Sequence, residues 1–299
     1  MSRLPAFVLL SAAAAFWGGN FIVGRAVSSS MPPLTLSFYR WLVALVFLLP
    51  LAGREVWRKR DQITANFGWF ALVAFTGTVL FHVLVYVGLG TTTAINATLL
   101  VATSPVVIPL VALIIHRERI AGLQGIGIAI SVVGVGIILT RAEIDVLTSF
   151  AFSSGDLYIL GAVVAWAIYS VVLRDRRDDL SPVGFVLAIT VLGVPLLFGL
   201  YLFELIGQGG FDVGPGHILT VLYVSLFASV LAYLAWNKGV ELIGAVRAGP
   251  YMSLMPVFAA LLAVVFLDET LELFHVAGTA VIALGLVLSG RRPVSRSTV

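Results

Sequence analysis

The chain has 299 residues, of which 60% are hydrophobic and only 11% are charged, with a formal net charge of +3. Soluble domains carry roughly 25% charged and 45–50% apolar residues, so this composition excludes an ordinary soluble domain and predicts an all-α membrane protein. The chain has no cysteine, which excludes disulfides and cysteine metal sites. The basic balance comes with no nucleic-acid-binding motif, so we expect no nucleic-acid partner.

Ten apolar runs are long enough to cross a bilayer as helices, which takes about 20 residues. In chain order they are Pro5–Val27, Leu34–Leu51, Phe67–Leu89, Ala94–Ile115, Leu123–Leu139, Leu157–Leu173, Val183–Phe203, Ile218–Asn237, Ala245–Leu267 and Leu273–Ser289. The first run is too long for a signal-peptide core and lacks a clear cleavage site, so we expect it to be a membrane helix.

The second half of the sequence repeats the first at an offset of about 150 residues. Matching pairs are Trp17 and Trp166, Arg25 and Arg174, Gly88 and Gly239, Ala94 and Ala245, Pro105 and Pro256, Glu118 and Glu269, and Gly134 and Gly285. Five crossings is an odd number, so the second copy enters the bilayer inverted. The sequence therefore predicts two inverted five-helix repeats, residues 1–145 and 150–299, around a central cavity, an architecture typical of secondary transporters.

Most basic residues fall in loops on one side of the membrane if both termini lie there as well. They are Arg54, Arg58, Lys59, Arg60, Arg117, Arg119, Arg174, Arg176, Arg177, Lys238, Arg291, Arg292 and Arg296. Most acidic residues fall on the other side. Because cytoplasmic loops are enriched in lysine and arginine, we expect a multi-pass protein with both termini in the cytoplasm.

Two tryptophans lie near the middle of their runs at matching positions of the repeats. Membrane tryptophans normally lie at the interfaces, as we expect for Trp41. Trp17 and Trp166 do not, and an indole N–H there needs a partner or a wet cavity. Asn20 and Tyr169 lie one turn further on, on the same faces. The alternative is a tryptophan packed between helices with its N–H bonded to a carbonyl.

Two further runs each carry a polar stripe. The stripes are Thr78, His82 and Tyr86 in the first half, and Ser229, Tyr233 and Asn237 at matching positions of the second. Residues four apart share one helix face, and polar groups in the membrane face the bundle interior or a water-filled path. We expect the stripes to line two half-pathways; the alternative is interhelical hydrogen bonding, worth about 0.6 kcal/mol on average.

Two prolines and an arginine lie inside apolar runs. A proline within a helix kinks it and frees the carbonyl four residues earlier. Pro105 and Pro256 would free the carbonyls of Val101 and Met252, which could accept a substrate ammonium. Arg40 is costly inside a membrane, so we expect it to face a cavity, a carbonyl or a carboxylate.

Small residues recur at helical spacing in the fifth and tenth runs. They are Gly127, Ser131, Gly134, Gly278 and Gly285. Such residues let helix backbones approach closely, which predicts a scaffold contact or a dimer face. We expect a monomer or a weak dimer.

Several absences narrow the function. No aspartate or glutamate lies in the middle third of any run, which disfavours export of cationic drugs, and no lysine lies there either. The chain lacks a phosphate-binding G-x-x-x-x-G-K-[ST] loop, metal-ligand histidine spacing and a hydrolase motif. We therefore expect no enzyme, no cofactor and no metal.

The sequence resembles the drug/metabolite transporter superfamily, specifically the EamA-type exporters. The pattern A-x-x-x-W-G-x-N-F from Ala13 to Phe21 matches, as do Arg25, Arg40, Pro105 with Glu118, and Pro256 with Glu269. The setting of His82, Tyr86, Trp17 and Trp166 is similar to that of the YddG-like exporters of aromatic amino acids. The resemblance implies cytoplasmic termini, a central cavity and efflux from the bacterial cytoplasm.

Together these observations predict an alternating-access exporter of neutral, preferably aromatic, amino acids in the bacterial inner membrane. The expected substrate-binding residues are Trp17, Asn20, Arg40, Thr78, His82, Tyr86, Trp166, Tyr169, Ser229, Tyr233 and Asn237, with Pro105 and Pro256 as helix kinks. One alternative is an exporter of other small uncharged metabolites or drugs. A more distant alternative is a non-transporting membrane receptor or scaffold.

Overall fold

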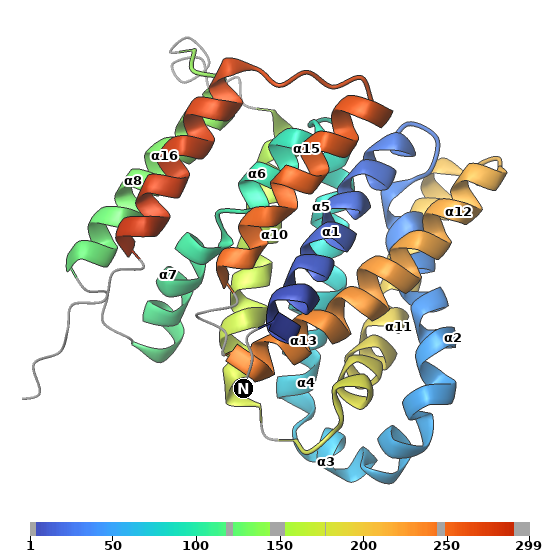
Figure 1. The fold of residues 1–299 in the computed structure, drawn as a ribbon. Helices are drawn as coiled ribbons and strands as arrows, with labels where there is room; N and C mark the ends of the chain where they lie inside the picture. Colours follow the sequence, from blue (N-terminus) through green and yellow to red (C-terminus); the bar gives the residue numbers. More distant parts are fainter. Residues whose placement is uncertain (1–3, 118–121, 144–152, 177, 244–248, 290–299) are drawn as a thin grey trace, which may run out of the picture.

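The structure, a computed structural model, describes residues 4–117, 122–143, 153–176, 178–243 and 249–289, and every regular element in these ranges is helical. The first half contains α1 (Leu4–Ala26), α2 (Pro33–Arg58), α3 (Arg60–Ala65), α4 (Phe67–Ala74), η1 (Phe75–Leu80), α5 (Phe81–Leu89), α6 (Ala94–Val101), α7 (Ser104–His116) and α8 (Gly122–Thr140). The second half contains α10 (Ser154–Val172), η2 (Leu173–Asp175), α11 (Pro182–Gln208), α12 (Pro215–Tyr223), η3 (Val224–Leu231), α13 (Ala232–Ile243), η4 (Gly249–Leu254), α15 (Met255–Phe266) and α16 (Leu273–Ser289). Figure 1 shows their arrangement.

Six helical stretches are long and apolar enough to cross a bilayer: Pro5–Ala26, Pro33–Arg58, Phe67–Leu89, Ser154–Val172, Pro182–Gln208 and Pro215–Gly239. Ala94–Val101 and Val106–His116 meet at 45° and make a seventh if they form one broken span. Gly125–Ile138, Met255–Phe266 and Leu273–Gly285 are apolar but shorter. By length and composition, the described part of the chain thus has six or seven membrane-capable helices, fewer than the ten apolar runs predicted from the sequence.

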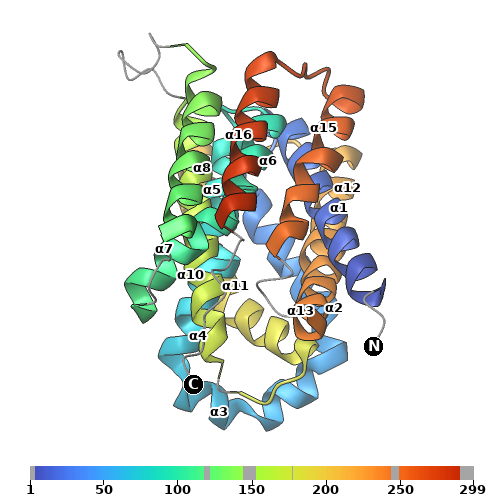
Figure 2. The same cartoon turned by 60° about the vertical axis from the view of Figure 1, so that its left-hand side comes forward.

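The centre of the bundle is built from helices of both halves. Helix α1 packs against α13 and α15, whereas α10 packs against α5 and α7. Figures 1 and 2 show α1 beside α13 and α15 from two directions. The bundle core therefore joins side chains that lie far apart in the sequence.

Helices α2 and α11 pack together and are capped by glutamates from each other. The first N–H groups of a helix have no intrahelical partner. The Glu204 carboxylate accepts from the backbone N–H of Leu34 at 3.1 Å and of Thr35 at 2.6 Å, at the start of α2. Glu55, near the end of α2, accepts from the backbone N–H of Ser181 at 2.8 Å, directly before α11. The two glutamates fix both ends of the pair.

Helices α8 and α16 meet through glycines. A Cβ atom added to Gly134 would lie 2.8 Å from the carbonyl oxygen of Gly278, so the two backbones touch. Ser131 Oγ donates to the carbonyl of Ile282 at 3.4 Å. The small residues that predicted a scaffold or a dimer face thus form a contact between these two helices.

The two repeated prolines begin helices instead of bending them. Pro105 and Pro256 lie in the first turns of α7 and α15, where the missing N–H would have had no intrahelical partner. The chain does bend by 45° between Ala94–Val101 and Val106–His116, so the interruption predicted at Pro105 lies at a helix start and not inside a helix. The Val101 carbonyl, predicted to be free, accepts from Ser104 Oγ at 2.6 Å.

Two spans contain a π-helical segment in their middle. Segment η1 lies between α4 and α5, and segment η3 lies between α12 and α13. Such segments are rare and frequently occur at functional sites. The carbonyls of Gly77 in η1 and Ala228 in η3 accept side-chain hydrogen bonds from the other half of the chain.

Candidate functional site

Arg40 lies at the centre of the site, and its side chain is almost completely buried in α2. Its Nε donates to Ser229 Oγ at 2.6 Å, and one terminal nitrogen donates to the Ala228 carbonyl at 3.0 Å. The other terminal nitrogen donates to Asn20 Oδ1 and to the Tyr86 hydroxyl, both at 2.8 Å. The guanidinium therefore joins α1, α2, α5 and η3.

Every described hydrogen-bond partner of Arg40 is neutral, and within the described ranges it makes no ion pair. A buried charge without a counter-ion is costly in a membrane. The guanidinium has five N–H groups, and four hydrogen bonds leave at least one N–H available. This combination favours a bound anionic group beside Arg40.

The partners of Arg40 are also bonded to each other. The Tyr86 hydroxyl donates to Asn20 Oδ1 at 2.7 Å, so this one amide oxygen accepts from both Tyr86 and Arg40. The Tyr86 hydroxyl proton is directed to Asn20, and the hydroxyl oxygen accepts from Arg40. The three side chains form a fixed triangle that orients the guanidinium.

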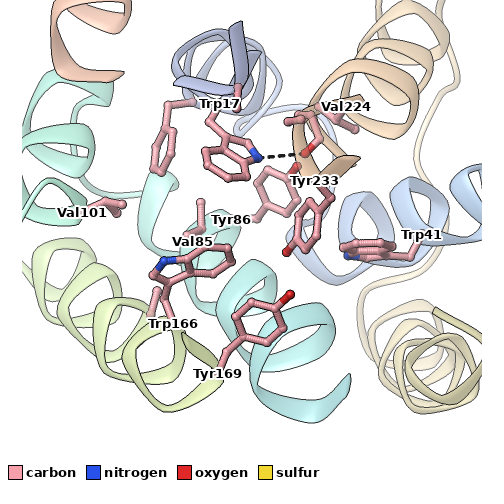
Figure 3. Close-up of a cluster of buried hydrophobic side chains, with 14 of the residues drawn as sticks. Trp17, Trp41, Val85, Tyr86, Val101, Trp166, Tyr169, Val224 and Tyr233 are labelled. Carbon is pink, nitrogen blue, oxygen red and sulfur yellow. Dashed lines mark hydrogen bonds between the residues drawn. The ribbon is translucent and has the colours of Figure 1, made fainter. Parts of the chain in front are cut away.

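Two indoles form an aromatic wall beside this triangle. The rings of Trp17 and Trp166 meet edge to face with centroids 5.7 Å apart, and the Tyr233 ring meets Trp17 edge to face at 6.0 Å. Trp166 stacks on Tyr169 at 5.0 Å. Figure 3 shows these four rings around one space, with the Trp17 N–H bonded to a carbonyl.

The N–H of Trp17 has a protein partner. It donates to the carbonyl of Ala228 at 3.0 Å, the same oxygen that accepts from Arg40. The alternative in which the N–H of an indole bonds a helix carbonyl therefore holds for Trp17. Its ring still borders the cavity.

A small cavity lies between the arginine and the aromatic wall. It is lined by Trp17, Asn20, Phe21, Arg40, Phe81, His82, Val101, Trp166, Tyr233, Met252 and Met255. The lining is mostly aromatic and apolar, with a cation on one side. The space is about large enough for one water molecule, so a larger ligand requires the helices to separate.

The structure gathers most of the predicted binding residues at this cavity. Trp17, Asn20, Arg40, His82, Trp166 and Tyr233 line it. Tyr86 and Ser229 contact it through Arg40. Thr78 and Tyr169 are buried, and their hydroxyl oxygens have no hydrogen-bond partner in the described chain. Asn237 is half-buried and does not line the cavity.

His82 is held by a tryptophan that the sequence analysis placed at an interface. Its Nδ1 lies 3.0 Å from the Thr78 carbonyl oxygen and 3.3 Å from Trp41 Nε1. Trp41 is fully buried and also meets Tyr233 edge to face at 5.6 Å. The expectation that Trp41 lies at a membrane interface is wrong, because its ring is buried inside the bundle against both His82 and Tyr233.

Sequence reasoning missed the backbone acceptors at Gly77 and Ala228. The Tyr233 hydroxyl donates to the Gly77 carbonyl at 3.1 Å. Neither residue has a side chain that signals a role, and a π-helical segment has no simple sequence pattern. The available signal was the stripes themselves, because Thr78 and Ser229 directly follow these two carbonyls.

Membrane-capable helices around a buried, partly polar cavity define the class of a multi-pass membrane transporter. The chain belongs to the EamA-like transporter family, whose sequence model matches it twice, over residues 4–140 and 153–291.

Known proteins similar to this chain include other transporters. A protein of Bacillus subtilis named "Uncharacterized transporter YyaM" is 26% identical over 96% of this chain and 94% of its own length. A protein of Salmonella typhimurium named "Probable amino-acid metabolite efflux pump" is 27% identical over 97% of this chain and 95% of its own. A solved crystal structure of a protein at 17% identity covers 96% of both chains with a TM-score of 0.65, which is a likeness of fold.

Proposed function

We propose that this transporter exports neutral amino acids, preferably aromatic ones, across the bacterial inner membrane by alternating access. The observation that carries this proposal is Arg40, a buried cation without a carboxylate partner in the described chain, beside an aromatic cavity. A guanidinium suits the substrate carboxylate, and the two indoles suit its ring. The similarity to the Salmonella efflux protein supports the same substrate class.

The proposal includes two inverted five-helix halves, residues 1–145 and 150–299, with both termini in the cytoplasm. The reciprocal glutamates support this architecture, because Glu55 and Glu204 lie 149 positions apart in the sequence and cap opposite ends of one helix pair. The glycine contact supports it as well, because Gly134 and Gly285 lie 151 positions apart and both pack in the α8–α16 contact.

The substrate ammonium needs neutral acceptors, because no acid lines the cavity among the described residues. Val101 and Met252 border the cavity, but the Val101 carbonyl already accepts from Ser104. We therefore assign the ammonium to the Met252 side of the cavity and to His82 Nε2, which is the acceptor nitrogen when Nδ1 donates to the Thr78 carbonyl. Zwitterions would then bind better than cations, since Arg40 repels a net positive charge.

The test is flux of labelled phenylalanine in liposomes containing the purified protein. Replacing both Trp17 and Trp166 by alanine removes the aromatic wall and is expected to lower phenylalanine exchange at least about tenfold, the equivalent of about 1.4 kcal/mol. Trp57→Ala is the matched control, because that indole is 70% exposed. Unchanged exchange in the double variant would remove the stacking role.

A competition panel in the same liposomes tests the substrate class. Unlabelled tryptophan and leucine are expected to compete with phenylalanine, whereas a nucleobase or a neutral sugar is not. Competition by the latter compounds alone would instead favour an exporter of other uncharged metabolites.

A further inference from the structure

At one end of the bundle, the connection between α5 and α6 is tied to three other parts of the chain. Arg25, at the end of α1, donates to the Leu89 carbonyl at 2.8 Å. Ser153, before α10, donates to the Thr91 carbonyl at 3.0 Å. Glu269, before α16, accepts from the backbone N–H of Ala94 at 2.9 Å. These contacts close this end of the bundle.

A buried acid lies inside this closed end and has no role in the cavity. Asp156 belongs to the first turn of α10, and its side chain is buried. The Thr92 hydroxyl donates to its carboxylate, and the side chain of Asn96 on α6 lies close by. The charged group that faces it is Arg141, directly after α8, and no ion pair with Asp156 occurs in the described chain.

Asn96 connects this acid to a buried histidine. The backbone N–H of Glu272 donates to His275 Nδ1 at 3.0 Å, so the ring proton belongs on Nε2. His275 Nε2 then donates to Asn96 Oδ1 at 2.8 Å. This fixes the amide orientation and leaves the Asn96 NH2 group free of His275. Asp156, Asn96 and His275 thus form a buried acid–amide–histidine group on α10, α6 and α16.

The charged groups facing His275 are Glu269, Glu272 and Arg141. Both glutamates precede α16, and Arg141 lies near the carboxyl end of α8. Glu269 is occupied by the backbone N–H groups of Ala94 and Ile95. Asp156 differs from Glu269, because its hydrogen bond comes from a side chain, the Thr92 hydroxyl.

The acid–amide–histidine group has no counterpart at the matching positions of the repeat. At the repeat offsets, Asp156 corresponds to Phe7, His275 to Gln124 and Thr92 to Ile243. The repeat therefore does not require an acid or a histidine here, whereas the glutamates that cap helices occur in both halves. Buried acids and histidines inside membrane bundles are typical of ion pathways and proton relays.

We infer that Asp156 is a proton-binding site that controls opening of this end of the transporter. The ionised carboxylate accepts from the Thr92 hydroxyl beside Asn96, and its charge suits the amino end of α10. One proton converts the carboxylate to the neutral acid, which weakens these contacts and loosens the α5–α6 connection. Under the proposed orientation, this end faces the acidic outer side, so each proton taken up there promotes substrate release outside.

The inference rests on the proposed export function only for that last step, and its test does not require the substrate. The chain has no cysteine, so spin labels can be placed at Gly90→Cys and Leu271→Cys, two exposed positions across the closed end. Distances are measured by electron paramagnetic resonance in liposomes at about pH 7.5 and about pH 5.5, a range in which imidazole groups titrate and into which burial moves carboxyl groups.

We expect a shift toward longer distances at low pH that is lost in Asp156→Asn and kept in the control Asp212→Asn, whose side chain is exposed. A shift that persists in Asp156→Asn, or no shift in the unmodified sequence, would overturn the inference. His275→Gln keeps an Nε-type donor to Asn96 but cannot titrate, so a shift lost only in that variant would move the proton site to His275 and overturn the assignment. Phenylalanine exchange at equal pH on both sides tests the export function separately.

Discussion

The π-helical segments η1 and η3 lie at matching positions of the two halves, yet they serve the cavity differently. The Ala228 carbonyl in η3 accepts from Arg40 and Trp17, whereas the Gly77 carbonyl in η1 accepts from Tyr233. The sequence explains the difference, because the position that matches Arg40 in the second half is Ile189. The same backbone device thus holds a cation on one side and a neutral phenol on the other.

This difference shows how a duplicated scaffold forms an asymmetric site. The backbone acceptors lie at matching positions, and the side chains that use them do not match. A zwitterion has different groups at its two ends, and a cavity with one cation suits such a ligand. We expect the Arg40 side to determine substrate recognition and the Tyr233 side to determine packing.

The largest effect is expected for Arg40→Met, which removes the cation from the cavity. Phenylalanine exchange in liposomes is expected to fall to background. Arg40→Met also leaves the buried side chains of Asn20, Tyr86 and Ser229 without the guanidinium as donor, which lowers stability, so exchange is compared at equal amounts of folded protein. Ile189→Met is the matched control at the corresponding position. Near-normal exchange in Arg40→Met would contradict the expectation that the Arg40 side determines substrate recognition.

A large effect on stability is expected for Gly77→Ala. Its Cβ would overlap the ring of Tyr169, and overpacking of this kind typically costs about 1–3 kcal/mol. Gly68→Ala is the control, because nothing lies within 4 Å of its added Cβ. The alanine there should be neutral or stabilising, since glycine lowers helix stability. Thermal unfolding of both variants in one detergent measures the difference; equal unfolding temperatures would contradict the close packing of η1.

A smaller effect distinguishes two tyrosines. Tyr86→Phe removes a hydrogen bond to a charged group, worth about 1.5–3 kcal/mol, whereas Tyr233→Phe removes one to a neutral carbonyl, worth about 0.5–1.5 kcal/mol. We therefore expect Tyr86→Phe to lower the free energy of unfolding more, as measured by denaturant titration. The reverse order would mean that the Gly77 side, and not the Arg40 side, is the better-bonded one.

The sequence predicted the general features of the fold and most of the lining. Apolar run lengths predicted the helices, because a membrane span must bury its backbone polar groups in a helix. The matching positions of Trp17 and Trp166, and the presence of Arg40 in an apolar run, pointed to the cavity they line. A charge or an unpaired indole N–H inside a membrane is energetically unfavourable, so both signals can be recognised from the sequence alone.

Other features could not be predicted because they depend on backbone geometry or on neighbours from distant helices. The residue types at Gly77 and Ala228 do not indicate that their carbonyls accept side-chain hydrogen bonds. Pro105 looked like a kink, since the break before it depends on Ser104 bonding the Val101 carbonyl. Asp156 directly precedes the predicted run Leu157–Leu173, and nothing in the sequence around it signals a role. Only the fold brings it beside Thr92.

Direct binding to the detergent-purified protein tests the central claim that Arg40 recognises a carboxylate. Phenylalanine, its amide and 3-phenylpropanoate are titrated by calorimetry into the unmodified protein and into Arg40→Met. We predict that the two carboxylate compounds bind the unmodified protein at least about tenfold more tightly than the amide, and that Arg40→Met loses this preference. Equal binding of phenylalanine and its amide to the unmodified protein would contradict the account.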